Sequence, residues 1–137
     1  MTTLEISRPW ARAASTVKDT AGGFFTVANK GGAPDRLVAA RSPAAGRIEI
    51  HAIKVVGPEI RMLPLENGLV FHPGTTVELK PRGYHLLMTG LKSPLRQGAK
   101  VPVTLTFEHA GEIAIELPVE APGLVGGDVL MEEYQRG

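Results

Sequence analysis

The sequence contains no cysteine, and this absence removes several classes of protein at once. Disulfides, thiolate nucleophiles, zinc ribbons and iron–sulfur clusters all need cysteine side chains. A blue-copper electron carrier is excluded as well, because its copper is bound by a cysteine thiolate. Any soft metal ligand in this chain must therefore be a methionine thioether, and the chain has four methionines.

The sequence also lacks a large excess of positive or negative charge, and it lacks long apolar runs. The chain has fifteen Lys and Arg residues and fourteen Asp and Glu residues, and the basic residues are scattered along it. This pattern argues against nucleic acid as a partner. No apolar run reaches the length of a membrane-spanning helix, so we expect no stable membrane insertion. The N-terminal stretch MTTLEISRPW lacks the basic and apolar segments of a signal peptide, and the chain as given is expected to be soluble.

A length of 137 residues fits a single domain. Sixteen glycines and eleven prolines divide the chain into short segments rich in Val, Ile, Leu, Thr and Phe, and no long segment has a clean helical period. The sequence therefore predicts an all-β sandwich over residues 1–120 and a flexible tail over residues 121–137. The expected strands lie near 4–7, 22–29, 36–41, 47–55, 59–65, 69–71, 76–80, 83–90, 101–108 and 112–120.

The segment HAIKVVGPEIRM, residues 51–62, predicts a hairpin that begins with a histidine and ends with a methionine. A turn centred on Val56 and Gly57 would set His51 directly opposite Met62, with Cβ atoms about 4.5–5.5 Å apart. One metal ion could bridge that gap. The other face of the hairpin carries an apolar set typical of a core, namely Ile48, Ile50, Leu63 and Leu65.

A second histidine and methionine lie in PRGYHLLMTGLK, residues 81–92. Regular strand alternation places His85 and Leu87 on one face and Met88 on the other, toward the core. A bulge in this strand would instead bring Met88 beside His85. The sequence favours the regular strand and leaves both arrangements open.

Other residues with functional side chains are better explained by structural roles. We expect His72 in a loop before a proline, His109 at the tip of a hairpin, Met131 as a packing residue of the tail and Trp10 as a core anchor. No G-x-S-x-G motif is present, which excludes one common class of hydrolase. The paired carboxylates Glu132-Glu133 fall in the tail, where solvation is the simpler explanation. The protein is not expected to be an enzyme.

The histidine and methionine spacing resembles that of the periplasmic copper chaperones of the PCuAC type. The resemblance is carried by SRPWARA, GGFFTVANKGGAPDRLVAARSPAAGRIEIH, VELKPRGYHLLMTGLK and VPVTLTFEHAGEI. Ten residues separate His51 from Met62, as in that family, and the interval of twenty-two residues from Met62 to His85 is one longer, which a turn at LENG can absorb. The family's second methionine falls at Leu87, whereas this chain has Met88 one position later.

The resemblance implies a cupredoxin-like Greek-key β-sandwich that binds Cu(I) at a shallow surface site. It further implies delivery of copper to an acceptor such as subunit II of cytochrome c oxidase, in the periplasm, with the signal peptide absent from this sequence. The donor chemistry agrees, because thioether sulfur and imidazole suit Cu(I). The ligands implied are His51, Met62, His85 and Met88.

Two other functions are open at this point. The chain could be a β-sandwich interaction module that has lost its metal, or a copper storage or buffering protein without a dedicated acceptor. We expect it to be a monomer.

Overall fold

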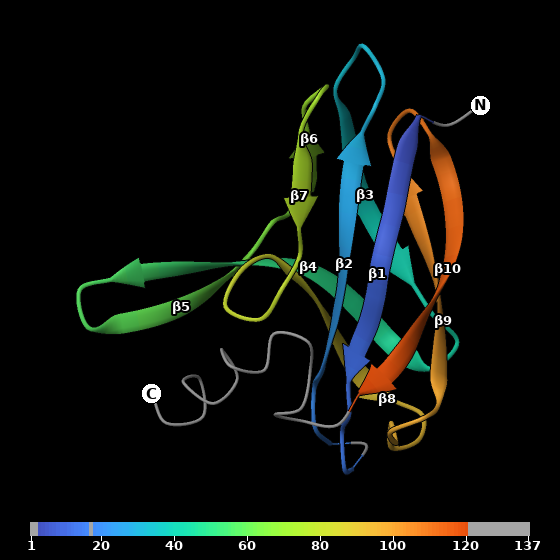
Figure 1. The fold of residues 1–137 in the computed structure, drawn as a ribbon. Coiled ribbons are helices and arrows are strands. Elements are labelled where there is room, and N and C mark those ends of the chain that lie inside the picture. Colours follow the sequence, from blue (N-terminus) through green and yellow to red (C-terminus); the bar gives the residue numbers. More distant parts are fainter. Residues whose placement is uncertain (1–2, 17, 121–137) are drawn as a thin grey trace.

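The structure, a computed structural model, describes residues 3–16 and 18–120. This part of the chain forms strands and turns without a helix, and hence without a helix long and apolar enough to cross a membrane. The predicted all-β class is confirmed (Figure 1). The predicted tail, with Met131 and the Glu132-Glu133 pair, lies outside the described residues. The strands are β1 (Leu4–Arg12), β2 (Ala21–Asn29), β3 (Asp35–Arg41), β4 (Ala45–Val56), β5 (Glu59–Pro64), β6 (Leu69–Phe71), β7 (Thr76–Glu78), β8 (His85–Leu91), β9 (Lys100–Phe107) and β10 (Gly111–Glu120).

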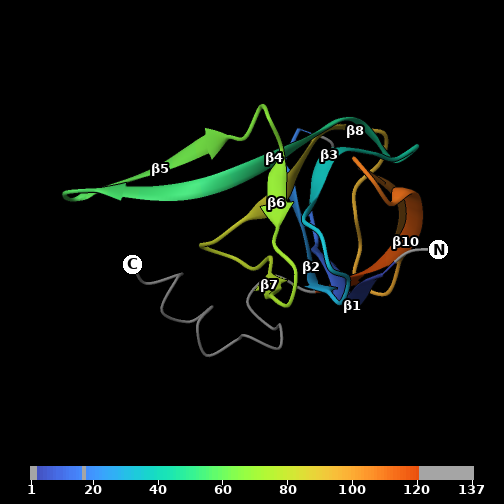
Figure 2. The ribbon, with the colours of Figure 1, turned by 90° about the horizontal axis from the view of Figure 1, so that it is seen from above.

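The strands follow one continuous order, β5-β4-β8-β2-β1-β10-β9-β3-β6, and β7 pairs with β2. Strands β1 and β10 run parallel where they meet, and the other pairs are antiparallel. The sheet curls over so that its two halves face each other around a shared core (Figure 2). The side chains buried most completely in this core are Phe25, Phe71, Phe107, Leu37, Leu79, Leu86, Met88, Leu105, Leu117, Val27 and Val103.

The β4–β5 hairpin turns through Gly57 and Pro58, with Val56 and Glu59 as the closing pair. Gly57 has a φ of 61°, the positive value that a type II′ hairpin turn requires of its first central residue. The predicted turn at Val56 and Gly57 is therefore wrong by one residue. Glycine occupies the first central position of the turn and not the second.

The displaced turn changes the partners across the hairpin. His51 lies opposite Pro64, and Met62 lies opposite Ile53. The predicted direct pairing of His51 with Met62 is wrong. Compared with the prediction, the residue opposite His51 and the residue opposite Met62 are each shifted by two positions along the strand. Side chains in a strand alternate with a period of two. His51 and Met62 therefore still share a face, as diagonal neighbours.

The far end of the hairpin extends away from the rest of the molecule (Figure 1). Every residue of β5 is exposed. The predicted core face is correct for Ile50, which is buried, and for Ile48 and Leu65, which pack against the core. Leu63 is 38% exposed, because β5 extends beyond the opposing half of the sandwich.

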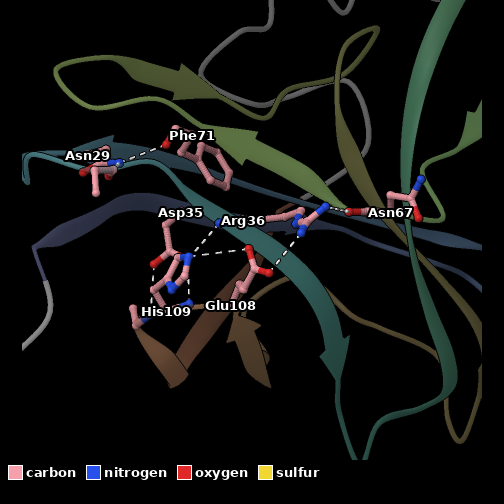
Figure 3. Close-up of polar contacts among 9 residues, drawn as sticks. Asn29, Asp35, Arg36, Asn67, Phe71, Glu108 and His109 are labelled. Carbon is pink, nitrogen blue, oxygen red and sulfur yellow. Dashed lines mark hydrogen bonds and ion pairs between the residues drawn. The ribbon is translucent and has the colours of Figure 1, made fainter.

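A polar cluster fixes the beginning of β3 to the β9–β10 turn (Figure 3). The buried carboxylate of Asp35 accepts hydrogen bonds from the backbone N–H groups of His109 and Ala110, at 2.8 and 2.9 Å. Nearby, the amide of Asn29 donates to the carbonyl of Phe71 at 2.9 Å. The side chain of His109 is exposed at the hairpin tip, where the sequence had placed it. The cluster has a structural role, because its hydrogen bonds satisfy buried polar groups.

Candidate metal centre

Two histidines lie side by side on neighbouring strands. His51 of β4 is directly opposite His85 of β8, and the centres of their rings are 5.7 Å apart. Two imidazoles bound to one ion through bonds of about 2 Å have ring centres no more than about 6.5 Å apart. Both side chains are buried, with 6% and 7% of their surface exposed. The pair is therefore spaced closely enough to bind a single metal ion.

The ring of His51 is oriented by a carboxylate on the same strand. Its Nε2 lies 2.9 Å from Oε1 of Glu49, which can only accept when ionised. This hydrogen bond, with a smaller contribution from Arg47, holds the pKa of Glu49 below its usual value. Nδ1 of His51 is buried and has no hydrogen-bond partner among the described residues. With the proton on Nε2, the lone pair of Nδ1 is available to a metal ion.

The ring of His85 is oriented by the backbone. Its Nδ1 donates to the carbonyl of Gly83 at 2.9 Å, which leaves the lone pair on Nε2. Burial lowers the pKa of His85, and electrostatic interactions with His51 and Arg12 lower it further, while the hydrogen bond to Gly83 acts in the opposite direction. The neutral imidazole, the form that binds metals, is therefore favoured.

We expect the stability of the metal-free protein to fall as the pH drops below about 6.5. The lowered pKa of His85 means that the unfolded chain takes up a proton there before the folded chain does, so protons favour unfolding. This contribution is fully present above about pH 6.5 and is lost as the pH falls through the lowered value. Urea unfolding of the parent and of His85→Gln at about pH 7.5 and about pH 5.5 measures it. A difference between the two proteins that does not change with pH would contradict the assignment.

A cleft of about 230 Å³ opens beside His85, whose neighbour His51 does not contribute to its lining. Met62, His85, Leu87 and Ile53 all contribute to its lining. Met62 is 49% exposed, so its side chain is accessible to solvent. Among residues 3–16 and 18–120 there is no group of three or more His, Cys, Asp or Glu side chains that could hold a metal ion. A metal site at this cleft would therefore draw on methionine sulfur as well as imidazole, a donor set suited to a soft ion.

Met88 lies away from the other three candidate ligands. It pairs with Ile48 and is 1% exposed, inside the core. The register from Arg47 to His51 against β8 is continuous, so the strand is regular there and no bulge turns Met88 toward His85. The position that faces the cleft is Leu87. The structure thus brings together His51, Met62 and His85, and it places Met88 on the opposite side of the sheet.

Two neighbours of the site have no role predicted from the sequence. Strand alternation places Glu49 on the same face as His51, two residues before it, but does not indicate a contact between the two side chains. Phe24 carried no such signal, and its ring centre lies 6.5 Å from that of His85. Trp10, expected as a core anchor, is only half-buried and stacks on Phe24 with ring centres 4.3 Å apart. His72 is exposed in a loop, as expected, and lies outside this group.

Known proteins are similar to this chain in sequence or in structure. Residues 4–119 match the family described as "Putative lipoprotein LpqE-like". The chain is 31% identical over 117 residues to "Putative lipoprotein Lxx21020" of Leifsonia xyli subsp. xyli, a match that spans 85% of this chain and 69% of that protein. Two solved structures superpose on most of it. The copper-bound PCuAC domain from PmoF2 has a TM-score of 0.73 and 27% identity, with 88% of this chain and 94% of that one covered. The apo PCuAC domain from PmoF1 has a TM-score of 0.70 and 30% identity, with 88% and 95% covered.

The fold and these similarities define the class, a PCuAC-type domain with a cupredoxin-like β-sandwich, and the predicted fold class and family resemblance are confirmed. The match over residues 4–119 identifies the family more closely. The chain belongs to the LpqE-like family.

Proposed function

We propose that this protein binds one Cu(I) ion through His51, Met62 and His85 and transfers it to another protein. The observation that carries the proposal is the histidine pair, because the two rings are neighbours and Nδ1 of His51 is buried with no partner in the part of the chain that the structure describes. A buried polar nitrogen without a partner is costly, and a bound metal ion would remove that cost. The thioether of Met62 adds the soft donor that distinguishes Cu(I) from harder ions. The copper-bound PCuAC domain from PmoF2 supports the same choice of metal.

Transfer requires that the ion be reachable from outside. The half-exposed Met62 provides an accessible ligand, while both histidines are fixed by hydrogen bonds to Glu49 and Gly83. An incoming ligand could displace the thioether first and the imidazoles later. We propose this stepwise ligand exchange as the mechanism, with a copper centre such as that of cytochrome c oxidase subunit II as the acceptor. The chain then acts as a carrier and not as an enzyme.

We propose that the protein works outside the cytoplasm, in the periplasm. The relative from Leifsonia xyli and the family itself are both named as lipoproteins, which supports a location beyond the cytoplasmic membrane. The proposed ligands suit this location. A cysteine thiolate can form disulfides in an oxidising compartment, whereas thioether and imidazole ligands cannot.

A Cu(I) titration of the metal-free protein under reducing conditions tests the proposal, with a competing chelator of known affinity. We expect a stoichiometry near one. An absence of binding would instead support a β-sandwich interaction module that has lost its metal. A transfer assay with a purified copper-accepting domain separates delivery from storage, since a storage protein would retain the ion.

Met62→Ala is expected to weaken Cu(I) binding by at least tenfold, about 1.4 kcal/mol, and to leave stability nearly unchanged. The side chain is half-exposed, so little core packing is lost. Leu63→Ala is the matched control, because Leu63 is the next residue on β5, is similarly exposed and points to the other face. Equal copper affinities of the two variants would remove Met62 from the site.

A further inference from the structure

The β4–β5 hairpin carries most of the large hydrophobic side chains that are exposed among the described residues. Five of the eight large hydrophobic side chains that are exposed in this part of the chain belong to it. Beyond His51, one face of the hairpin is apolar out to the turn, because Ile53 pairs with Met62 and Val55 pairs with Ile60. Contiguous apolar surface of this kind marks an interaction site on a soluble protein.

The hairpin also presents an open sheet edge. Strand β5 pairs with β4 on one side and with no other strand among the described residues. Val56 and Glu59 close a two-residue turn and exchange hydrogen bonds with each other. Alternation then directs the backbone N–H and C=O groups of Ile60 and Met62 toward the open edge. An uncovered edge of this type pairs readily with another strand.

The charged side chains of β5 indicate which strand can pair with its open edge. The sequence Glu59-Ile60-Arg61 is self-complementary, since an antiparallel second copy centred on Ile60 sets each Glu59 opposite the other copy's Arg61. That register also uses the free backbone groups of Ile60. Moving it by one residue on each strand, to a centre at Arg61, would place the two Arg61 side chains directly opposite each other and is disfavoured.

The surroundings of Arg61 strengthen this choice. Within one chain, Lys54 lies directly opposite Arg61, a like-charge pair that is unfavourable. Glu59 already contacts the Arg61 guanidinium along the strand, at 2.6 Å. A second copy would add its own Glu59 on the side of Arg61 away from Lys54. Each charge at the paired edge would then have neighbours of opposite sign.

We propose that two copies of this chain associate through their β5 edges, as an antiparallel pair centred on Ile60. The two sandwiches then share one continuous sheet. Ile60 and Val55 of both copies lie on the same face of that sheet as Met62. This proposal goes beyond the copper-carrier function, departs from the expected monomer and does not require copper.

Sedimentation velocity of the full chain over about 1 μM to about 1 mM tests it, with and without one equivalent of Cu(I). We expect a concentration-dependent shift from monomer to dimer. Arg61→Glu and Glu59→Arg should each lower the association constant by at least tenfold, because each sets like charges opposite one another twice. The double variant Glu59→Arg/Arg61→Glu should associate like the parent, and a mixture of the two single variants should form a mixed dimer.

Lys54→Glu is the matched control. Lys54→Glu and Arg61→Glu change the net charge by the same amount, and both residues lie on the same face of the hairpin. Lys54 is on β4, however, and not on the edge strand β5. The Lys54→Glu variant should associate at least as well as the parent. A parent that stays monomeric, or single charge variants that associate as strongly as the parent, would overturn the proposal. Neither result would change the interpretation of the copper titration, which tests His51, Met62 and His85.

Discussion

His51→Ala is expected to weaken Cu(I) binding by at least tenfold, about 1.4 kcal/mol, while the protein stays folded. The imidazole supplies Nδ1, a buried nitrogen that forms no hydrogen bond within residues 3–16 and 18–120. Its removal takes away one ligand and also the donor to Glu49. That carboxylate remains partly exposed and retains its ion pair with Arg47 at 2.5 Å, so it is not left isolated in an apolar environment. The loss should therefore appear in copper affinity more than in folding.

Chelator competition measures the affinity, and urea unfolding of the metal-free proteins measures the stability. His72→Ala is the matched control, because His72 is an exposed loop histidine away from the cleft. It should bind copper like the parent. If His51→Ala instead loses several kcal/mol of stability and keeps its copper affinity, His51 is a core residue and the proposed site is wrong.

The role of Glu49 can be separated from that of His51. Glu49→Gln keeps the size of the side chain but replaces the carboxylate that orients Nε2 of His51. Outer-shell partners of this kind typically contribute about 10- to 100-fold in metal affinity. We expect a loss in that range for Glu49→Gln, with the stoichiometry near one unchanged.

Local patterns in the sequence predicted which residues share a face, and those assignments survive an error in the register. The turn was displaced by one residue because Gly57 takes the first central position. Each cross-strand partner then moved by two positions, which leaves the alternation unchanged. His51 and Met62 therefore remain on one face although they are not directly opposite.

The pairing of His51 with His85 could not be predicted in the same way. It depends on β8 lying beside β4, and these strands are separated in sequence by β5, β6 and β7. No turn or local period encodes that neighbourhood, because the order of strands is set by packing of the whole core. The family resemblance brought the two histidines together where the local pattern could not. The exposure of Leu63 has the same origin, since it depends on how far β5 extends beyond the opposing strands.

Met88→Ala is expected to reduce the free energy of unfolding by about 2–4 kcal/mol and to change copper affinity little. Met88 is 1% exposed and packs in the core on the side of β8 opposite His85. Truncation would leave a cavity there and would remove no group from the cleft. Urea unfolding and chelator competition on the same preparation separate the two effects.

Leu87→Met is the complementary change, because Leu87 lines the cleft together with Met62 and His85. A thioether at this position would add a second sulfur donor where the PCuAC family has its second methionine, and Cu(I) binding should tighten. X-ray absorption of the Cu(I) complexes counts the sulfur ligands directly. One sulfur in the parent and two in Leu87→Met would support a site of two histidines and one methionine. Two sulfurs in the parent, reduced to one together with a loss of affinity in Met88→Ala, would mean that β8 rearranges around copper to bring Met88 to the ion.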